Sequence, residues 1–183
     1  MALAKKTVFL DRDGTLIEER CYLSDPVGVK LEREVAPALA QLCSVGFQLL
    51  VVTNQSGLAR GYFNVNDLLS VNARVHALLA ARGVVIAGWY YCPHAPGDAC
   101  ACRKPAPGLL EQAAVDFPVD WARSFFIGDS RSDASAALAK GIAPILLATG
   151  KGAGLGNWAA ERGVPWLPDM SAAKDFILAR ENK

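Results

Sequence analysis

Hydrophobic and polar positions alternate along this chain in two kinds of segment. Short apolar runs typical of buried strands occur at 7–10, 47–52, 84–91, 124–128 and 143–150. Apolar residues at helical spacing occur between and after these runs, at 33–46, 66–83, 108–117, 132–141 and near 171–181. Strands that alternate with helices through short connections predict βαβ units. The fold class predicted is therefore α/β, a parallel sheet with helices on both faces.

Two local signals refine these boundaries. In the segment 66–83, Asn66 is placed to cap the start of a helix and Gly83 to stop it. The glycine-rich stretch 150–156 is predicted to be a mobile linker near the site. A direct contribution from its Lys151 is the less favoured alternative.

Polar side chains follow three of the predicted strands. Asp11 comes directly after 7–10, Thr53 after 47–52, and Asp129 after 124–128. In open parallel sheets, functional residues collect beyond the carboxyl ends of the strands. The chemistry of this protein is therefore expected where these three ends converge.

The first two of these ends are ambiguous when each is taken alone. In "DRDGTL", Asp11 and Asp13 are either two solvated carboxylates of a turn or a nucleophile beside an acid/base. In "TNQSG", the hydroxyl of Thr53 and the amides that follow suit phosphate oxygens, but such polar loops are also commonplace.

The other two signals involve a basic pair and a further aspartate. Arg103 and Lys104 either neutralise a phosphate or are solvated loop charges. Asp129 is of the type that holds Mg²⁺ together with a second carboxylate, whereas Asp133 is equally explained by the first turn of a helix. All four signals fall after predicted strands, and this joint occurrence favours a phosphoryl-transfer site.

Length and composition limit the alternatives. A chain of 183 residues, 52% hydrophobic and 20% charged, predicts one domain over 1–183. The net charge of +1 provides no overall basic field for nucleic acid or a membrane, so neither is an expected partner, and a monomer is expected. No apolar run approaches the roughly 18 residues of a spanning helix, and the first residues do not resemble a signal peptide. We expect a cytoplasmic protein with reduced thiols.

Three of the five cysteines and one of the two histidines gather within eleven residues, in "CPHAPGDACAC". Four nitrogen and sulfur ligands suit a closed, structural Zn²⁺ site, formed by Cys92, His94, Cys100 and Cys102. Free buried thiols or a redox pair are the alternatives. A zinc loop over 92–102 would fix the position of the basic pair that follows it.

The motifs "DRDGTL", "TNQSG", "CRKP" and "GDSRSD" resemble, in order, the four motifs of the haloacid dehalogenase (HAD) superfamily. The resemblance implies a three-layer Rossmann-like fold of HAD type. It implies that Asp11 is the nucleophile and Asp13 the general acid/base, and that Thr53 and Lys104 hold the phosphoryl group. Catalytic Mg²⁺ would be held by Asp11, the backbone carbonyl of Asp13, and Asp129.

The zinc loop and "TNQSGLARGYF" are similar to the branch that contains the heptose bisphosphate and histidinol-phosphate phosphatases. The implied activity is Mg²⁺-dependent hydrolysis of a sugar bisphosphate, at the 7-phosphate of D-glycero-D-manno-heptose 1,7-bisphosphate, in nucleotide-heptose synthesis for lipopolysaccharide or capsule. The implied substrate contacts are Glu19, Arg20, Cys21, Tyr22, Asn54, Gln55, Ser56, Arg103 and Ser130.

Several alternatives stay open at this point. Histidinol phosphate is the second candidate substrate, and a non-catalytic, zinc-stabilised binding module is the candidate of another class. Arg60 either contacts a second phosphate or is a solvated charge. No insertion is large enough for a separate cap domain, so loops alone are expected to set selectivity.

Overall fold

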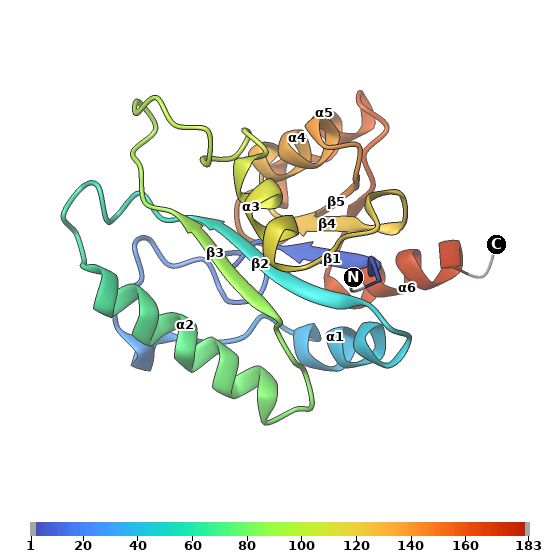
Figure 1. The fold of residues 1–183 in the computed structure, drawn as a ribbon, viewed down its shortest axis with the longest axis horizontal. Coiled ribbons are helices and arrows are strands. Elements are labelled where there is room, and N and C mark those ends of the chain that lie inside the picture. The colour runs from blue at the N-terminus through green and yellow to red at the C-terminus, as the bar shows by residue number, and fades with distance from the viewer. Residues whose placement is uncertain (1–2, 182–183) are drawn as a thin grey trace.

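Parallel strands form one central sheet in the structure, a computed structural model that describes residues 3–181. Within that range the sheet has six strands in the order β3-β2-β1-β4-β5-β6, and every neighbouring pair is parallel (Figure 1). The strands are β1 Thr7–Leu10, β2 Gln48–Asn54, β3 Gly88–Cys92, β4 Phe125–Gly128, β5 Ala143–Leu147 and β6 Trp166–Leu167. The predicted α/β class with a parallel sheet is confirmed.

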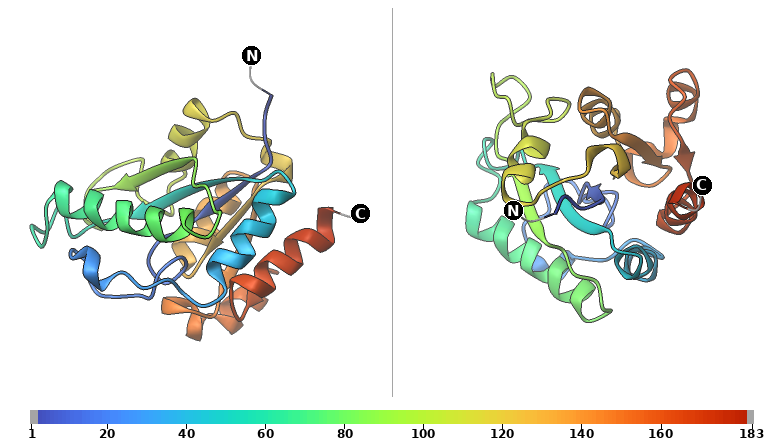
Figure 2. Two further views of the ribbon diagram at one scale, coloured as in Figure 1. Left: turned by 90° about the horizontal axis from the view of Figure 1, so that it is seen from below. Right: turned by 45° about the vertical axis from the view of Figure 1, so that its right-hand side comes forward.

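Helices cover both faces of this sheet, as predicted. They are α1 Val35–Ser44, α2 Val65–Ala80, α3 Gly108–Asp116, α4 Arg131–Ala139, α5 Gly156–Ala160 and α6 Met170–Glu181. Side chains of α1, α2 and α6 share one buried cluster with the sheet, and these helices lie together in Figure 2 (left). Side chains of α3, α4 and α5 belong to clusters on the opposite face. Short 3-10 turns occur at Pro26–Gly28, Trp121–Arg123 and Gly150–Gly154.

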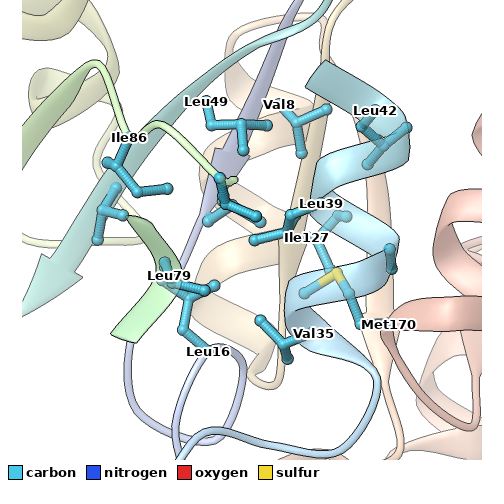
Figure 3. Close-up of a cluster of buried hydrophobic side chains, with 14 of the residues drawn as sticks. Val8, Leu16, Val35, Leu39, Leu42, Leu49, Leu79, Ile86, Ile127 and Met170 are labelled. Atoms are coloured by element: carbon cyan, nitrogen blue, oxygen red, sulfur yellow. The ribbon is translucent and has the colours of Figure 1, made fainter. Parts of the chain in front are cut away.

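The central strands are mostly apolar because both of their faces are buried. Successive side chains of a strand point to opposite faces, so Val8 packs toward α1 whereas Phe9 stacks on Trp121 and Phe126. Figure 3 shows Val8 with Leu39 of α1 in the first of these cores. Burial on both faces explains why "TVFL" carries only one polar residue, the buried Thr7.

The predicted strand 84–91 is wrong in its first half, because only residues from Gly88 onward pair with β2. Val84 and Ile86 are buried in the core while Val85 is exposed. The alternating pattern of a strand therefore arises here from the packing of the loop that leads into β3. Pairing with β2 begins where Gly88 comes opposite Leu50.

The predicted cap of α2 is also wrong, by two residues. Asn64, and not Asn66, accepts hydrogen bonds from the backbone N–H groups of Asn66 and Asp67, and the carboxylate of Asp67 accepts one from the N–H of Asn64. This reciprocal capping box satisfies backbone donors at both positions, which explains the earlier start.

The order of the strands positions the functional residues. From β1 the chain proceeds outward through β2 and β3 on one side, and through β4 to β6 on the other. A crevice forms where the direction changes, between the carboxyl ends of β1 and β4. Asp11 follows β1 and Asp129 follows β4, and the N–H of Asp11 donates to the carbonyl of Ile127 at 3.0 Å. Over residues 3–181, no helix has the length and apolar character that a membrane crossing requires.

Candidate active site

A pocket of about 420 Å³ lies at the carboxyl ends of the strands. Every side chain predicted to be catalytic, to contact substrate or to ligate Mg²⁺ lines it: Asp11, Asp13, Glu19, Arg20, Cys21, Tyr22, Thr53, Asn54, Gln55, Ser56, Arg103, Lys104, Asp129 and Ser130. Segments separated by more than a hundred residues thus meet in one cavity. The pocket also includes Arg12, Arg60 and Lys151.

Lys104 lies between two carboxylates, those of Asp11 and Asp133. Its side chain is buried, and its Nζ is 3.0 Å from Asp11 Oδ1, 2.6 Å from Asp133 Oδ1 and 2.8 Å from the carbonyl oxygen of Val52. Burial alone would lower the pKa of Lys104, but the carboxylates of Asp11 and Asp133 outweigh it and raise the pKa. Lys104 is therefore a fixed cation beside Asp11.

Asp133 holds the Lys104 ammonium group in place through an ion pair. Its Oδ2 accepts hydrogen bonds from the N–H and hydroxyl of Ser130 at 3.0 and 2.6 Å, while its Oδ1 faces Lys104. The prediction that Asp133 lies in the first turn of a helix is confirmed, since it caps α4. Its second contact, to Lys104, depends on a residue 29 positions away and was missed.

Asp129 occupies a tight cradle beside Asp11. Its Oδ2 accepts a hydrogen bond from the N–H of Lys151 at 2.8 Å. Gly14 and Gly150, both at positive φ, approach so closely that a Cβ on either would overlap the Asp129 carboxylate. Burial, together with the nearby Asp11 carboxylate, raises the pKa of Asp129 to about 8.

This cluster of carboxylates fits a divalent cation. Oxygen atoms of Asp11, Asp129 and Asp133 all lie within 4.8 Å of one another, and hard cations such as Mg²⁺ prefer carboxylate oxygen. Both oxygens of Asp133 are already engaged by Lys104 and Ser130. Asp11 and Asp129 are therefore the better-placed ligands, and the predicted magnesium set that contains them remains a prediction.

The side chain of Asn54, at the end of β2, holds the backbone of the loop that carries Lys104. The Asn54 amide donates to the carbonyl of Lys104 at 3.0 Å and accepts from its N–H at 3.1 Å. Arg103 donates to the carbonyl of His94 at 3.1 Å, which joins it to the cysteine-rich loop. Asn54, predicted as a substrate contact, thus also positions the lysine.

The four predicted zinc ligands form one cluster beside this loop. Cys92 Sγ lies 3.5 Å from His94 Nδ1, 3.8 Å from Cys100 Sγ and 3.2 Å from Cys102 Sγ, and His94 Nδ1 lies 3.3 Å from Cys102 Sγ. Burial and the neighbouring thiols raise the pKa of Cys92 to about 12. A bound Zn²⁺ stabilises such a buried thiol as thiolate, and three sulfur ligands with one imidazole nitrogen suit its tetrahedral coordination, so the residues fit that ion.

The glycine-rich stretch 150–156 is not the linker that the sequence suggested. It forms a 3-10 turn and enters α5, and its backbone packs against Asp129. Lys151 Nζ forms an ion pair with Glu19 Oε2 at 2.8 Å, and both residues line the pocket. The less favoured alternative, a direct contribution of Lys151 to the site, is thus the arrangement observed. The one feature of the sequence that pointed to this contribution is the position of Lys151 directly after the predicted strand 143–150.

The sequence of this chain is similar to those of known phosphatases. Residues 101–173 match the family model described as HAD-hydrolase-like, a range that includes Lys104, Asp129 and Asp133. D-glycero-beta-D-manno-heptose-1,7-bisphosphate 7-phosphatase from Pseudomonas putida is 41% identical over 165 residues, which cover 87% of this chain and 90% of that protein. The enzyme of the same name from Yersinia pestis is 40% identical, with 97% and 92% covered.

The chain belongs to the heptose bisphosphate phosphatase family of HAD hydrolases. A solved structure agrees: that of D,D-heptose 1,7-bisphosphate phosphatase from B. bronchiseptica, complexed with magnesium and phosphate, has a TM-score of 0.87 and 34% identity. The match covers 96% of the chain described here and 99% of the B. bronchiseptica chain. The predicted HAD resemblance is confirmed.

Proposed function

We propose that this chain is a Mg²⁺-dependent phosphatase that hydrolyses the 7-phosphate of D-glycero-D-manno-heptose 1,7-bisphosphate through an aspartyl-phosphate at Asp11. The names of the relatives support the substrate. The observation that carries the chemistry is the buried Lys104, held 3.0 Å from Asp11 at the base of an open pocket. A cation fixed beside a carboxylate suits the transfer of a phosphoryl group to that carboxylate.

The first step joins Asp11 to phosphorus. One carboxylate oxygen of Asp11 attacks in line and the sugar oxygen departs. Lys104 and the Thr53 hydroxyl stabilise charge on the phosphoryl oxygens. Mg²⁺, held by Asp11, Asp129 and the Asp13 backbone carbonyl, would supply further charge neutralisation when bound.

Asp13 then serves both halves of the reaction. It gives a proton to the departing sugar alkoxide and later takes one from the water that hydrolyses the aspartyl-phosphate. Its carboxylate lines the same pocket as Asp11, two residues away in the chain. A group able to activate water beside the acyl phosphate favours a phosphatase over a phosphotransferase.

The rest of the pocket is suited to a second phosphate. Four cationic side chains line it besides Lys104: Arg20, Arg60, Arg103 and Lys151. Guanidinium groups bind phosphate through two parallel hydrogen bonds. Arg60, left open by the sequence, is assigned here to substrate recognition together with the predicted contacts Glu19 to Tyr22, Asn54 to Ser56, and Ser130.

The proposal also includes the role of the zinc site, the oligomeric state and the pathway. Zn²⁺ at Cys92, His94, Cys100 and Cys102 would be structural and would hold Arg103 and Lys104 in place. The chain would act as a single capless domain and a monomer in the cytoplasm. Its product would enter nucleotide-heptose synthesis for lipopolysaccharide or capsule.

A phosphate-release assay tests the proposal. Purified protein with Mg²⁺ should release phosphate from either anomer of the heptose bisphosphate at least tenfold faster, in kcat/KM, than from histidinol phosphate. The reverse order would assign the chain to the second substrate. Asp11→Asn should abolish turnover and leave the fold intact, because Lys104 keeps its contact with Asp133. No phosphate release from any sugar phosphate by the wild type would instead favour a binding module without catalysis. Equal turnover by Asp11→Asn and wild type would exclude Asp11 as the nucleophile.

A further inference from the structure

Helix α2 carries one polar residue in its buried face. Leu68, Val71, Val75 and Leu79 of that face belong to or border the core, yet Asn72 is also buried, with 8% of its surface exposed. A buried amide requires hydrogen-bond partners. Asn72 Oδ1 accepts a hydrogen bond from Arg12 Nη1 at 2.8 Å.

Arg12 is itself a buried charge, with 1% of its surface exposed. Its Nε donates to Asp13 Oδ2 at 3.1 Å, and its Nη2 donates to Asp13 Oδ1 at 3.1 Å. Over the described residues 3–181, Asp13 is the one carboxylate with which Arg12 forms an ion pair. The planar guanidinium therefore grips both oxygens of Asp13 while its third nitrogen is tied to α2.

A second side chain holds Asp13 from the other direction. Gln55 Nε2 lies 2.8 Å from Asp13 Oδ2 and 3.0 Å from Thr53 Oγ1, and Gln55 is 5% exposed. Oδ2 thus accepts from two side chains. Among the described residues 3–181, Oδ1 accepts a hydrogen bond from Arg12 alone, so it is the less engaged of the two oxygens. The carboxylate is held in a single orientation.

We propose that Arg12, anchored by Asn72, is a positioning residue that orients the Asp13 carboxylate for proton transfer. The inference rests on the proposed function, in which Asp13 is the acid/base. All three side-chain nitrogens of Arg12 are engaged by Asp13 and Asn72, so Arg12 acts through Asp13 and not on substrate directly. A misplacement of about 1 Å at such a group lowers rate on the order of a hundredfold.

Two variants disturb this connection in different ways. Asn72→Ala keeps Arg12 but removes its anchor, and alanine is well tolerated within a helix. Arg12→Lys keeps the charge but cannot contact Asn72 and both oxygens of Asp13 together. Each should lower kcat about 10- to 100-fold while KM for the bisphosphate stays within about twofold.

Val75→Ala is the matched control. Val75 is fully buried in the same face of α2, so its truncation destabilises the helix by loss of packing. The melting temperature should fall as much as in Asn72→Ala, or more, while kcat at 25 °C stays within about twofold. A similar loss of kcat in Val75→Ala would mean that α2 packing in general is required, and would overturn the positioning role.

A double-mutant cycle supplies the decisive readout. If Arg12 acts through Asp13, then Asn72→Ala should change the residual kcat of Asp13→Asn by less than about twofold. Loss of the same factor in both backgrounds would overturn the inference. The proposed function fails separately, if the wild type releases no phosphate from the bisphosphate or if Asp13→Asn leaves kcat unchanged. Should Arg12→Lys not fold, the Asn72 cycle still decides.

Discussion

Replacement of Lys104 by methionine should separate the structural and the chemical contributions of the buried cation. Methionine has a similar volume but leaves Asp11 and Asp133 facing each other without a counter-charge. Removal of one partner of a buried ion pair costs about 3–5 kcal/mol. In a chain of this size, each kcal/mol corresponds to a shift in melting temperature of about 2–4 °C. Asp11 retains some contact with solvent, at 13% side-chain exposure, so we expect the lower part of the resulting range, about 6–12 °C.

The second replacement, Asp133→Asn, restores the balance of charge. The amide oxygen that this change introduces can still accept from Ser130, so the double variant Lys104→Met/Asp133→Asn should recover at least half of the lost melting temperature. Turnover should stay down about 100-fold or more in both, because no cation then faces the transferring phosphoryl group. Lys140→Met is the control: Lys140 pairs at 2.9 Å with the exposed Glu111, and such surface pairs contribute at most about 1 kcal/mol.

The assay is thermal melting in magnesium-free buffer, followed by phosphate release with Mg²⁺ present. Magnesium is left out of the melting experiment because a bound cation would itself relieve the repulsion between carboxylates. A melting temperature of Lys104→Met within about 2 °C of wild type would refute the argument that the ion pair supports the fold. Recovery of turnover in the double variant would refute the chemical role of Lys104.

Two further predictions concern the metal sites. In magnesium-free buffer the melting temperature should fall as pH rises from about 5 to 8, because Asp129 has a pKa of about 8 when folded and near 4 when unfolded, so the folded state holds a proton that the unfolded chain has lost. Asp129→Asn should remove most of this slope, and an unchanged slope would exclude Asp129 as its source. Cys100→Ser should lower the zinc content measured by metal analysis, together with melting temperature and kcat, whereas Cys43→Ser, outside the cluster, should retain zinc; full zinc content in Cys100→Ser would contradict the ligand set.

The sequence is enough to predict five of the six strands in the described residues 3–181, and many of the side chains that line the pocket. Runs such as 7–10 and 124–128 are mostly apolar because they are buried on both faces, and each is followed by an aspartate. Parallel strands bring their carboxyl ends to one edge, so residues after separate strands are brought together by the architecture itself. The clustering of Cys92, His94, Cys100 and Cys102 is likewise local, since all four lie within eleven residues.

The tertiary structure alone decided which polar side chains pair within that pocket. Lys104 with Asp133, Lys151 with Glu19, and Arg12 with Asn72 join positions from 29 to 132 residues apart. Hydrophobic periodicity shows that a helix has a buried face, but not which residue of another segment lies opposite. That pairing depends on how each helix and loop packs on the sheet, and it determines whether a polar residue such as Asn72 or Lys104 is a surface group or part of the site.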